Sequence, residues 1–306
     1  MDFTKLLNLQ IMMFLMMATG VFLRKKNIIT LEGKKVLTDL VIDLILPCNI
    51  IASFCIEFSP EILKRCGQVF VISCLIEVVC TFLATHIYKK FPKGKRMVLQ
   101  YGTICSNAGF LGNPLTEGIY GSMGLLYASI YLIPQRIIMW SAGVSFFTES
   151  PDKKTLVKKV VTHPCIVACM IGIIVMGLQI TLPDFLFDTI NNIGKCTTAI
   201  TMILIGAILS EADLKTMVTK TTAAFSLLRL IIIPLMVFAG CLLTRMPMFV
   251  TGVSVVLAAM PAGTTTAILA VKYNGDEEFA TKCVVLTTLL SMIMVPIWCL
   301  VIQAAY

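Results

Sequence analysis

Ten long apolar runs, separated by short polar or Gly- and Pro-containing interruptions, fill this chain of 306 residues almost from end to end. A helix needs about 20 consecutive apolar residues to cross the hydrocarbon core of a bilayer. The runs therefore predict an all-α polytopic membrane protein with ten transmembrane helices, some of them long enough to be tilted or broken. The expected spans are 5–23, 34–56, 62–88, 97–117, 121–147, 161–180, 188–210, 217–244, 248–272 and 279–304.

Composition and missing motifs exclude several other classes of protein. Hydrophobic residues make up 58% of the chain and charged residues 14%, whereas soluble domains have about 45–50% and about 25%. Ten spans leave no length for a soluble catalytic domain. The chain also contains no GxxxxGK[ST] phosphate loop, no HExxH zinc motif and no GxGD motif of an intramembrane protease. We therefore predict a protein that is not an enzyme and that needs no metal and no cofactor.

The basic residues gather in alternate interruptions. Eighteen Lys and Arg lie in the first, third, fifth, seventh and ninth interruptions, and five lie near the N-terminus and in the others. Because cytoplasmic loops carry the excess of Lys and Arg, this bias predicts that both termini face the extracellular or periplasmic side of the cell membrane, which we take to be a bacterial inner membrane. The bias also accounts for the net charge of +8 without a nucleic-acid partner.

Each half of the chain holds five expected spans. An odd number inverts the second half, so residues 1–148 and 161–306 are predicted to be inverted five-helix repeats joined by a cytoplasmic linker at 149–160. The fourth span contains SNAGFLGNPL (106–115) and the ninth AMPAGTTTA (259–267), with their Ala-Gly pairs 154 residues apart. The fifth and tenth spans each contain a proline, Pro134 and Pro296. Matched interrupted spans indicate the binding site of a secondary transporter.

Clusters of Gly, Asn, Pro and Thr at mid-membrane depth free backbone groups, which is tolerated where the backbone lines a cavity or is buried in protein. An ordinary kink is the alternative. The half-helix after each break starts with unsatisfied N–H groups and the positive end of the helix dipole, which favours an anion. Neutral donors are added by Asn107, Asn113, Thr264, Thr265 and Thr266. We therefore predict an organic-anion site at the crossing of spans four and nine.

Several segments resemble the auxin efflux carrier family, which includes plant PIN carriers and bacterial malate and malonate permeases. They are SNAGFLGNPL in the fourth span, AAMPAG and AVKYN around the ninth, LILPCN at 44–49 and LLRLIIIPL at 227–235. The resemblance implies a scaffold domain, a transport domain with two crossed broken helices, elevator-type alternating access and a homodimer formed through the scaffold. Because the long cytoplasmic loop of many plant members is absent, a compact carrier of organic acids fits better than an auxin carrier.

The resemblance also implies roles for single residues. Asn107 matches the asparagine that contacts the substrate carboxylate, and Pro261 matches the proline at the ninth-span crossing. Ser106 stands where the family usually has proline, so we expect the fourth-span break to depend on its glycines and on Pro114. The expected substrate-binding set is Asn107, Gly109, Gly112, Asn113, Pro114, Pro261, Gly263, Thr264, Thr265, Gln135 and Arg136.

Ionisable residues inside spans are expensive and are therefore functional candidates. Asp43, one turn before Pro47, is a candidate for a coupling proton, with an ion pair to Arg136 or Arg229 as the alternative. Arg136 is a candidate for binding a second carboxylate, with a scaffold ion pair as the alternative. Sodium coupling through unwound carbonyls and the hydroxyls of residues 264–266 is the other option. The expected coupling or ion-pair set is Asp43, Asn49, Glu77, Arg229 and Thr266.

The sequence leaves more than one function open. The first is a secondary active transporter of small mono- or dicarboxylates such as malate-like acids, coupled to H⁺ or Na⁺ or uncoupled. The second is a sodium-coupled carrier similar to the bile acid symporters. The third is a membrane receptor or sensor that binds a ligand without moving it. The expected partners are a small organic acid, the lipid bilayer and a second copy of the chain.

Overall fold

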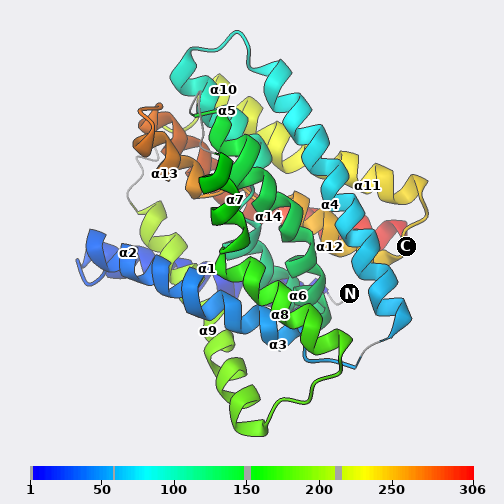
Figure 1. The fold of residues 1–306 in the computed structure, drawn as a ribbon. Helices are drawn as coiled ribbons and strands as arrows, with labels where there is room; N and C mark the ends of the chain where they lie inside the picture. The colour runs from blue at the N-terminus through cyan, green and yellow to red at the C-terminus, as the bar shows by residue number, and fades with distance from the viewer. Residues whose placement is uncertain (1–2, 58, 148–152, 211–215) are drawn as a thin grey trace. The chain divides into compact units, whose positions relative to one another are not determined.

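The structure is a computed structural model that describes residues 3–57, 59–147, 153–210 and 216–306, and every regular element in these ranges is a helix (Figure 1). Fourteen α-helices are interrupted by four π-helical turns, η1–η4. In chain order they are α1 (Phe3–Lys25), α2 (Leu31–Leu40), η1 (Val41–Ile45), α3 (Leu46–Phe54), α4 (Pro60–Ile87), α5 (Lys93–Ile104), η2 (Ala108–Gly112), α6 (Asn113–Ile138), η3 (Met139–Gly143), α7 (Lys153–Val161), α8 (Pro164–Gly177), α9 (Asp184–Leu209), α10 (Lys220–Leu227), η4 (Leu228–Ile232), α11 (Ile233–Leu243), α12 (Met248–Ala258), α13 (Thr265–Lys272) and α14 (Glu277–Ala305).

Six helical segments of the described chain are long and apolar enough to cross a membrane, and two shorter apolar helices accompany them. The six are Leu7–Lys25, Leu31–Phe54, Pro60–Ile87, Asp184–Leu209, Lys220–Leu243 and Glu277–Ala305. The expected fourth and ninth spans are divided into short helices, as the Gly and Pro clusters predict. The chain is thus a multi-pass membrane protein, and the count of ten spans stays a prediction.

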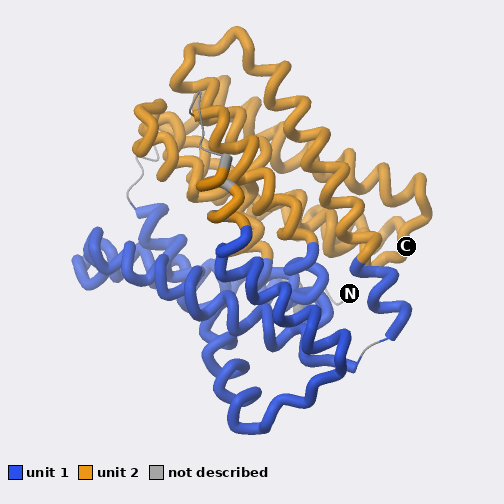
Figure 2. The backbone as a smooth tube through the Cα atoms, viewed as in Figure 1, with its two compact units in different colours: residues 1–66, 113–130, 161–211 blue, residues 67–112, 131–160, 212–306 orange. Residues whose placement is uncertain are grey.

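The chain folds into two compact units, each assembled from segments of both halves (Figure 2). Unit 1 comprises 1–66, 113–130 and 161–211, and unit 2 comprises 67–112, 131–160 and 212–306. Neither unit coincides with an expected repeat, because a repeat is a unit of sequence whereas a compact unit follows spatial contact. Most of the expected linker at 149–160 belongs to helix α7, which begins at Lys153. The start of the linker, 149–152, lies outside the described residues. So do residue 148, at the end of the first expected repeat, and Lys215, one of the basic residues of the seventh interruption.

Unit 1 is built on very close helix contacts. Helix α1 packs along α9, and a Cβ added at Gly20 would overlap the backbone of Ile203, while one added at Gly206 would overlap the backbone of Met17. Helix α3 packs against α8 and α9. Small residues let helix backbones approach closely, which is the main source of packing energy between helices in lipid.

Unit 2 is organised around α14, which contacts α5, α10, α12, α13 and η4. Helix α12 is buried on all sides, with every residue from Val250 to Ala258 shielded. The indole Nε1 of Trp298 donates a hydrogen bond to the carbonyl of Leu230 at 2.9 Å, which ties α14 to the π turn η4. A helix that is apolar all round belongs in a protein interior, so α12 is the core of this unit.

Three of the π turns end two residues before a proline. Pro47, Pro114 and Pro234 each occupy one of the first two positions of the helix that follows η1, η2 or η4. A proline ring clashes with the carbonyl four residues earlier in a regular helix. The wider π turn relieves that clash, as at η1, where the amide of Leu46 reaches back five residues to Val41. The prolines therefore set where these helices widen.

Candidate functional site

The two predicted breaks meet inside unit 2 as a short antiparallel bridge. The amide of Asn107 donates to the carbonyl of Pro261 at 2.8 Å, and the amide of Gly263 donates to the carbonyl of Cys105 at 2.8 Å. These bonds flank the pair Ser106 and Ala262. The fourth- and ninth-span interruptions are thus short non-helical segments that satisfy each other's backbone, which is how non-helical backbone is tolerated inside a membrane protein.

The bridge geometry requires small side chains at its centre. Ser106 and Ala262 form the non-hydrogen-bonded type of antiparallel pair, in which opposing side chains are closest. Gln135 fixes the first segment, because its Nε2 donates to the Ser106 carbonyl at 2.8 Å and its Oε1 accepts from the Ser106 hydroxyl at 2.8 Å. The hydroxyl of Thr287 on α14 fixes the second segment by accepting from the Ala262 amide at 3.2 Å. Gln135 is therefore a positioning residue of the crossing.

Glycines set how closely the crossing segments approach. A Cβ at Gly263 would lie 3.0 Å from Sγ of Cys105, and one at Gly112 would lie 2.8 Å from Cδ2 of Leu257 on α12. Gly109 differs, because a Cβ there would meet nothing within 4 Å. The first π turn after the bridge therefore packs tightly at Gly112 and borders open space at Gly109.

Three of the expected site residues in unit 2 each have a buried polar atom without a hydrogen-bond partner in the described structure: Nδ2 of Asn107, Nη1 of Arg136 and Oγ1 of Thr266. The Asn107 and Arg136 side chains are 3% and 6% exposed. Leaving a buried donor unpaired costs about 1–3 kcal/mol, and more for a charged group. Amide and guanidinium groups left this way are suited to receive an acceptor from a ligand.

The hydroxyl of Thr265 is occupied by the protein itself. It accepts from the Tyr101 hydroxyl at 3.3 Å and lies 3.3 Å from Sγ of Cys105. Thr264 precedes α13 as its N-terminal cap residue, without a capping side-chain hydrogen bond. The three consecutive threonines therefore differ in role. Thr265 holds α13 to α5, Thr264 lies at the start of α13, and Thr266 is buried with its hydroxyl unpaired among the described residues.

Two buried ionisable residues of unit 2 accompany the crossing. Glu77 on α4 and Arg229 in η4 are 5% and 4% exposed. Both lie close enough to Cys105 at the bridge to influence its thiol electrostatically. Oε2 of Glu77 and Nε of Arg229 have no hydrogen-bond partner in the described chain. Glu77 and Arg229 are thus buried ionisable neighbours of the crossing inside unit 2.

Comparison with known proteins agrees with the membrane fold. The model of the family described as "membrane transport protein", which is the auxin efflux carrier family, matches residues 7–299. The chain belongs to this family. It is 29% identical to an uncharacterised transporter of Methanothermobacter thermautotrophicus over 74% of this chain and 78% of that protein. It is 24% identical to an uncharacterised transporter of Methanocaldococcus jannaschii over 94% and 96%. The chain is accordingly a membrane transporter and not an enzyme.

Four of the expected site residues, Asp43, Asn49, Asn113 and Pro114, lie in unit 1. Asn49 donates from Nδ2 to Oε2 of Glu117 at 3.1 Å, and Cα of Asn49 faces Gly194 on α9. Asn113 is fully buried and neither of its amide atoms has a partner among the described residues. Pro114 follows it within the first turn of α6. Unit 1 therefore contains its own polar contact, between the buried amide of Asn49 and the half-buried carboxyl of Glu117.

The proton role of Asp43 stays a prediction. Its side chain is exposed on η1, whereas the sequence argument required burial at mid-depth. The reason is the helix face: Val41 and Ile45 are the residues of η1 that turn inward. Glu77, another residue of the expected coupling or ion-pair set, is buried.

Sequence reasoning missed four residues that shape these sites: Glu117, Tyr101, Cys105 and Thr287. Glu117 could have been found, because it is an ionisable residue at the end of an expected span and follows Asn113 by one helical turn. The others carry no such signal, since a tyrosine, a cysteine or a threonine in an apolar run is ordinary. Among the described residues, no group of three or more His, Cys, Asp or Glu could hold a metal ion.

Proposed function

We propose that this transporter is a secondary carrier of small organic anions, whose carboxylate is bound beside the crossing of the two broken segments in unit 2. The observation that carries the proposal is the buried Nδ2 of Asn107, a donor without a partner next to the bridge. The N-termini of the helices that leave the bridge add positive dipole ends. A carboxylate oxygen supplies the acceptor that Asn107 lacks.

Arg136 favours dicarboxylates as the substrate class. Its guanidinium is buried, and Nη1 has no partner in the described structure. Arg136 also directly follows Gln135, which holds Ser106 of the bridge. A guanidinium binds a carboxylate in bidentate geometry. A malate-like acid would then place one carboxylate at Asn107 and the other at Arg136.

We assign the moving role in an elevator-type mechanism to unit 2, because the bridge and its supporting residues lie wholly within it. Unit 1, with its close α1–α9 contact, is assigned the role of the scaffold and of the dimer contact. Hydrogen bonds from Gln135 and Thr287 make the bridge a rigid body inside unit 2. A rigid site can be carried without being rebuilt at each step.

Proton coupling is assigned to Glu77 in place of Asp43. Glu77 is buried near Cys105 of the bridge, and neither its Oε2 nor Nε of Arg229 has a hydrogen-bond partner in the described structure. A buried carboxyl is costly when it is charged. Binding or loss of a proton at Glu77 therefore changes the free energy of placing unit 2 in the bilayer. Sodium coupling at Thr266 and neighbouring carbonyls is the alternative that gradient experiments distinguish.

The test is uptake into proteoliposomes with imposed H⁺ or Na⁺ gradients and a panel of mono- and dicarboxylates. Asn107→Ala should lower uptake at least tenfold, because a hydrogen bond to a charged group contributes about 1.5–3 kcal/mol. Asn192→Ala, at an exposed position of α9, is the matched control and should transport like wild type.

Three outcomes contradict this function. Wild-type flux in Asn107→Ala would remove the proposed site. Saturable binding of a carboxylate without any uptake would identify a receptor or sensor instead. Uptake of bile acids that requires sodium and excludes small carboxylates would favour the symporter-like alternative.

A further inference from the structure

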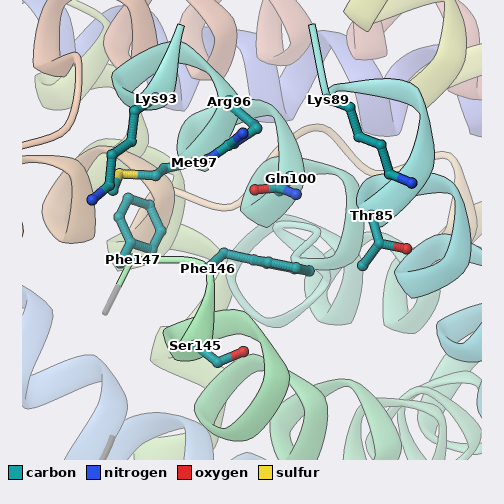
Figure 3. Close-up of a pocket in the computed structure, with 9 residues that line it drawn as sticks. All are labelled: Thr85, Lys89, Lys93, Arg96, Met97, Gln100, Ser145, Phe146 and Phe147. Carbon is teal, nitrogen blue, oxygen red and sulfur yellow. The ribbon is translucent and has the colours of Figure 1, made fainter. Parts of the chain in front are cut away.

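A polar cavity of unit 2 lies where α4 ends and α5 begins (Figure 3). It has a volume of about 270 Å³. Three side chains from these helix ends, Lys89, Lys93 and Arg96, line it together with Gln100 and Thr85 (Figure 3). The segment after η3 closes another side with Ser145, Phe146 and Phe147. None of its nine lining residues is acidic.

The walls of this cavity are held in place by the protein. Nε2 of Gln100 donates to the carbonyl of Ala84 at 3.2 Å, which joins α5 to α4 across the cavity. The ring of Phe147 packs edge-on against Tyr101, with ring centroids 5.5 Å apart. The cavity is therefore preformed.

The positive charge here is not explained by helix stability. Helix α5 starts at Lys93 with no acidic residue in its first turn and no side-chain cap. Cations near a helix N-terminus oppose the dipole, so Lys93 and Arg96 sit at the unfavourable end of α5. Basic residues placed against the helix dipole are typical of a binding site.

An exposed apolar stripe on α4 leads to the cavity. Val71, Leu75, Val78 and Phe82 are 53%, 62%, 65% and 61% exposed. They follow one another at intervals of four and three residues, and the same spacing continues to Thr85 and Lys89 in the cavity wall. Residues at this spacing share one helix face. In a membrane protein such a face contacts acyl chains.

We propose that this cavity binds the phosphate headgroup of an anionic phospholipid whose acyl chain follows the stripe on α4. Basic pockets between transmembrane helices on the positively charged side of the protein are suited to such headgroups. Arg96 binds phosphate oxygens with its planar fork, and Lys89 and Lys93 supply further positive charge. The proposal does not depend on what the bridge transports.

Native mass spectrometry of the detergent-solubilised full chain with added phosphatidylglycerol or phosphatidylcholine tests this site. Wild type should bind phosphatidylglycerol more tightly than phosphatidylcholine. The variant Lys89→Gln/Lys93→Gln should weaken phosphatidylglycerol binding at least tenfold, since each basic residue near an anionic headgroup contributes about fivefold. Both side chains are exposed, so the substitutions spare the core. Arg96→Gln, tested alone, should give a loss of about fivefold.

Lys25→Gln/Lys35→Gln is the matched control, because it removes two exposed charges elsewhere. It should change phosphatidylglycerol binding less than twofold. Equal losses in the two double variants would overturn the site in favour of general surface charge, and wild-type binding in Lys89→Gln/Lys93→Gln would overturn it outright. Displacement of the lipid by equimolar inorganic phosphate would identify a soluble-anion site and overturn the lipid assignment.

Discussion

At the scale of single residues, hydrogen bonding distinguishes the residue that positions the crossing from the residues that are expected to bind the substrate. Gln135 uses both ends of its amide on Ser106, so it has little left for a ligand. Asn107 and Arg136 keep donors that no described group of the protein accepts. Ligand contact is therefore expected from Asn107 and Arg136, whereas Gln135 maintains the segment on which Asn107 lies.

Arg136→Gln should separate dicarboxylate from monocarboxylate transport. Removing the guanidinium takes away the partner of the second carboxylate, so dicarboxylate uptake should fall at least tenfold while monocarboxylate uptake changes less than threefold. Competition assays with acids of matched chain length measure the ratio. Arg136→Lys, which keeps the charge but loses the planar fork, should show an intermediate loss. Equal losses for both classes in Arg136→Gln would indicate a structural guanidinium.

Glu77→Gln should uncouple transport from the proton gradient. The amide cannot exchange a proton, so gradient-driven accumulation should fall to the level without a gradient, whereas exchange of labelled for unlabelled substrate should persist. Glu61→Gln is the control, because Glu61 is exposed on the same helix and pairs with Arg65. Gradient-driven accumulation that survives in Glu77→Gln would move coupling elsewhere.

At the scale of helices, α1 and α9 are joined by reciprocal glycine contacts. Gly20→Ala or Gly206→Ala would force the two backbones apart, and overpacking costs typically about 1–3 kcal/mol. Gly67→Ala provides a control of opposite sign, because a Cβ there meets nothing within 4 Å and alanine favours helix over glycine by about 1 kcal/mol. Thermal unfolding in one detergent should lower Tm for the first two variants and maintain or raise it for the third. A lowered Tm in all three would mean that glycine matters for helix flexibility instead.

The helix ends around each break have a common form that the sequence partly revealed. The segment after the first break ends at Gly121, with φ of 68°, and α13, which ends at Lys272, is followed two residues later by Asn274, with φ of 52°. Clusters of Gly, Pro and Asn located both breaks, because those residues cannot sit in regular helix without cost. The pairing of Ser106 with Ala262 could not be deduced, since it depends on how two distant segments meet.

The contacts between long helices were also beyond the sequence. In lipid, the faces that pack against other helices and the faces that contact lipid are both apolar. The pattern of apolar residues therefore indicates that a helix is inserted but does not indicate which helix it packs against. Nothing in the run around Met17 or Ile203 identifies them as neighbours of Gly206 and Gly20. The exposure of Asp43 could not be predicted for the same reason. Burial of Glu77 was anticipated as a candidate because its charge stands out against an apolar run.

At the scale of the whole molecule, the alternation of basic residues predicts which connections share a side of the membrane. Lys35, between α1 and α3, belongs to the first interruption, and Thr181, between α8 and α9, belongs to the sixth. Eighteen against five basic residues place the first of these inside and the second outside. Both side chains are exposed, so both positions accept a reporter.

Lys35→Cys and Thr181→Cys, each in a Cys196→Ser background, should therefore differ in their reaction with a membrane-impermeant maleimide. In intact cells Thr181→Cys should be labelled, and Lys35→Cys should be labelled only after permeabilisation. Subtracting the labelling of the Cys196→Ser background corrects for the remaining native cysteines. The opposite result would invert the orientation, and labelling of both from one side would remove the assignment of these two connections to opposite faces. Ser122→Cys extends the test across the first broken segment. Three spans are expected between residues 35 and 121, so position 122 should lie on the outside and should be labelled by the same reagent in intact cells.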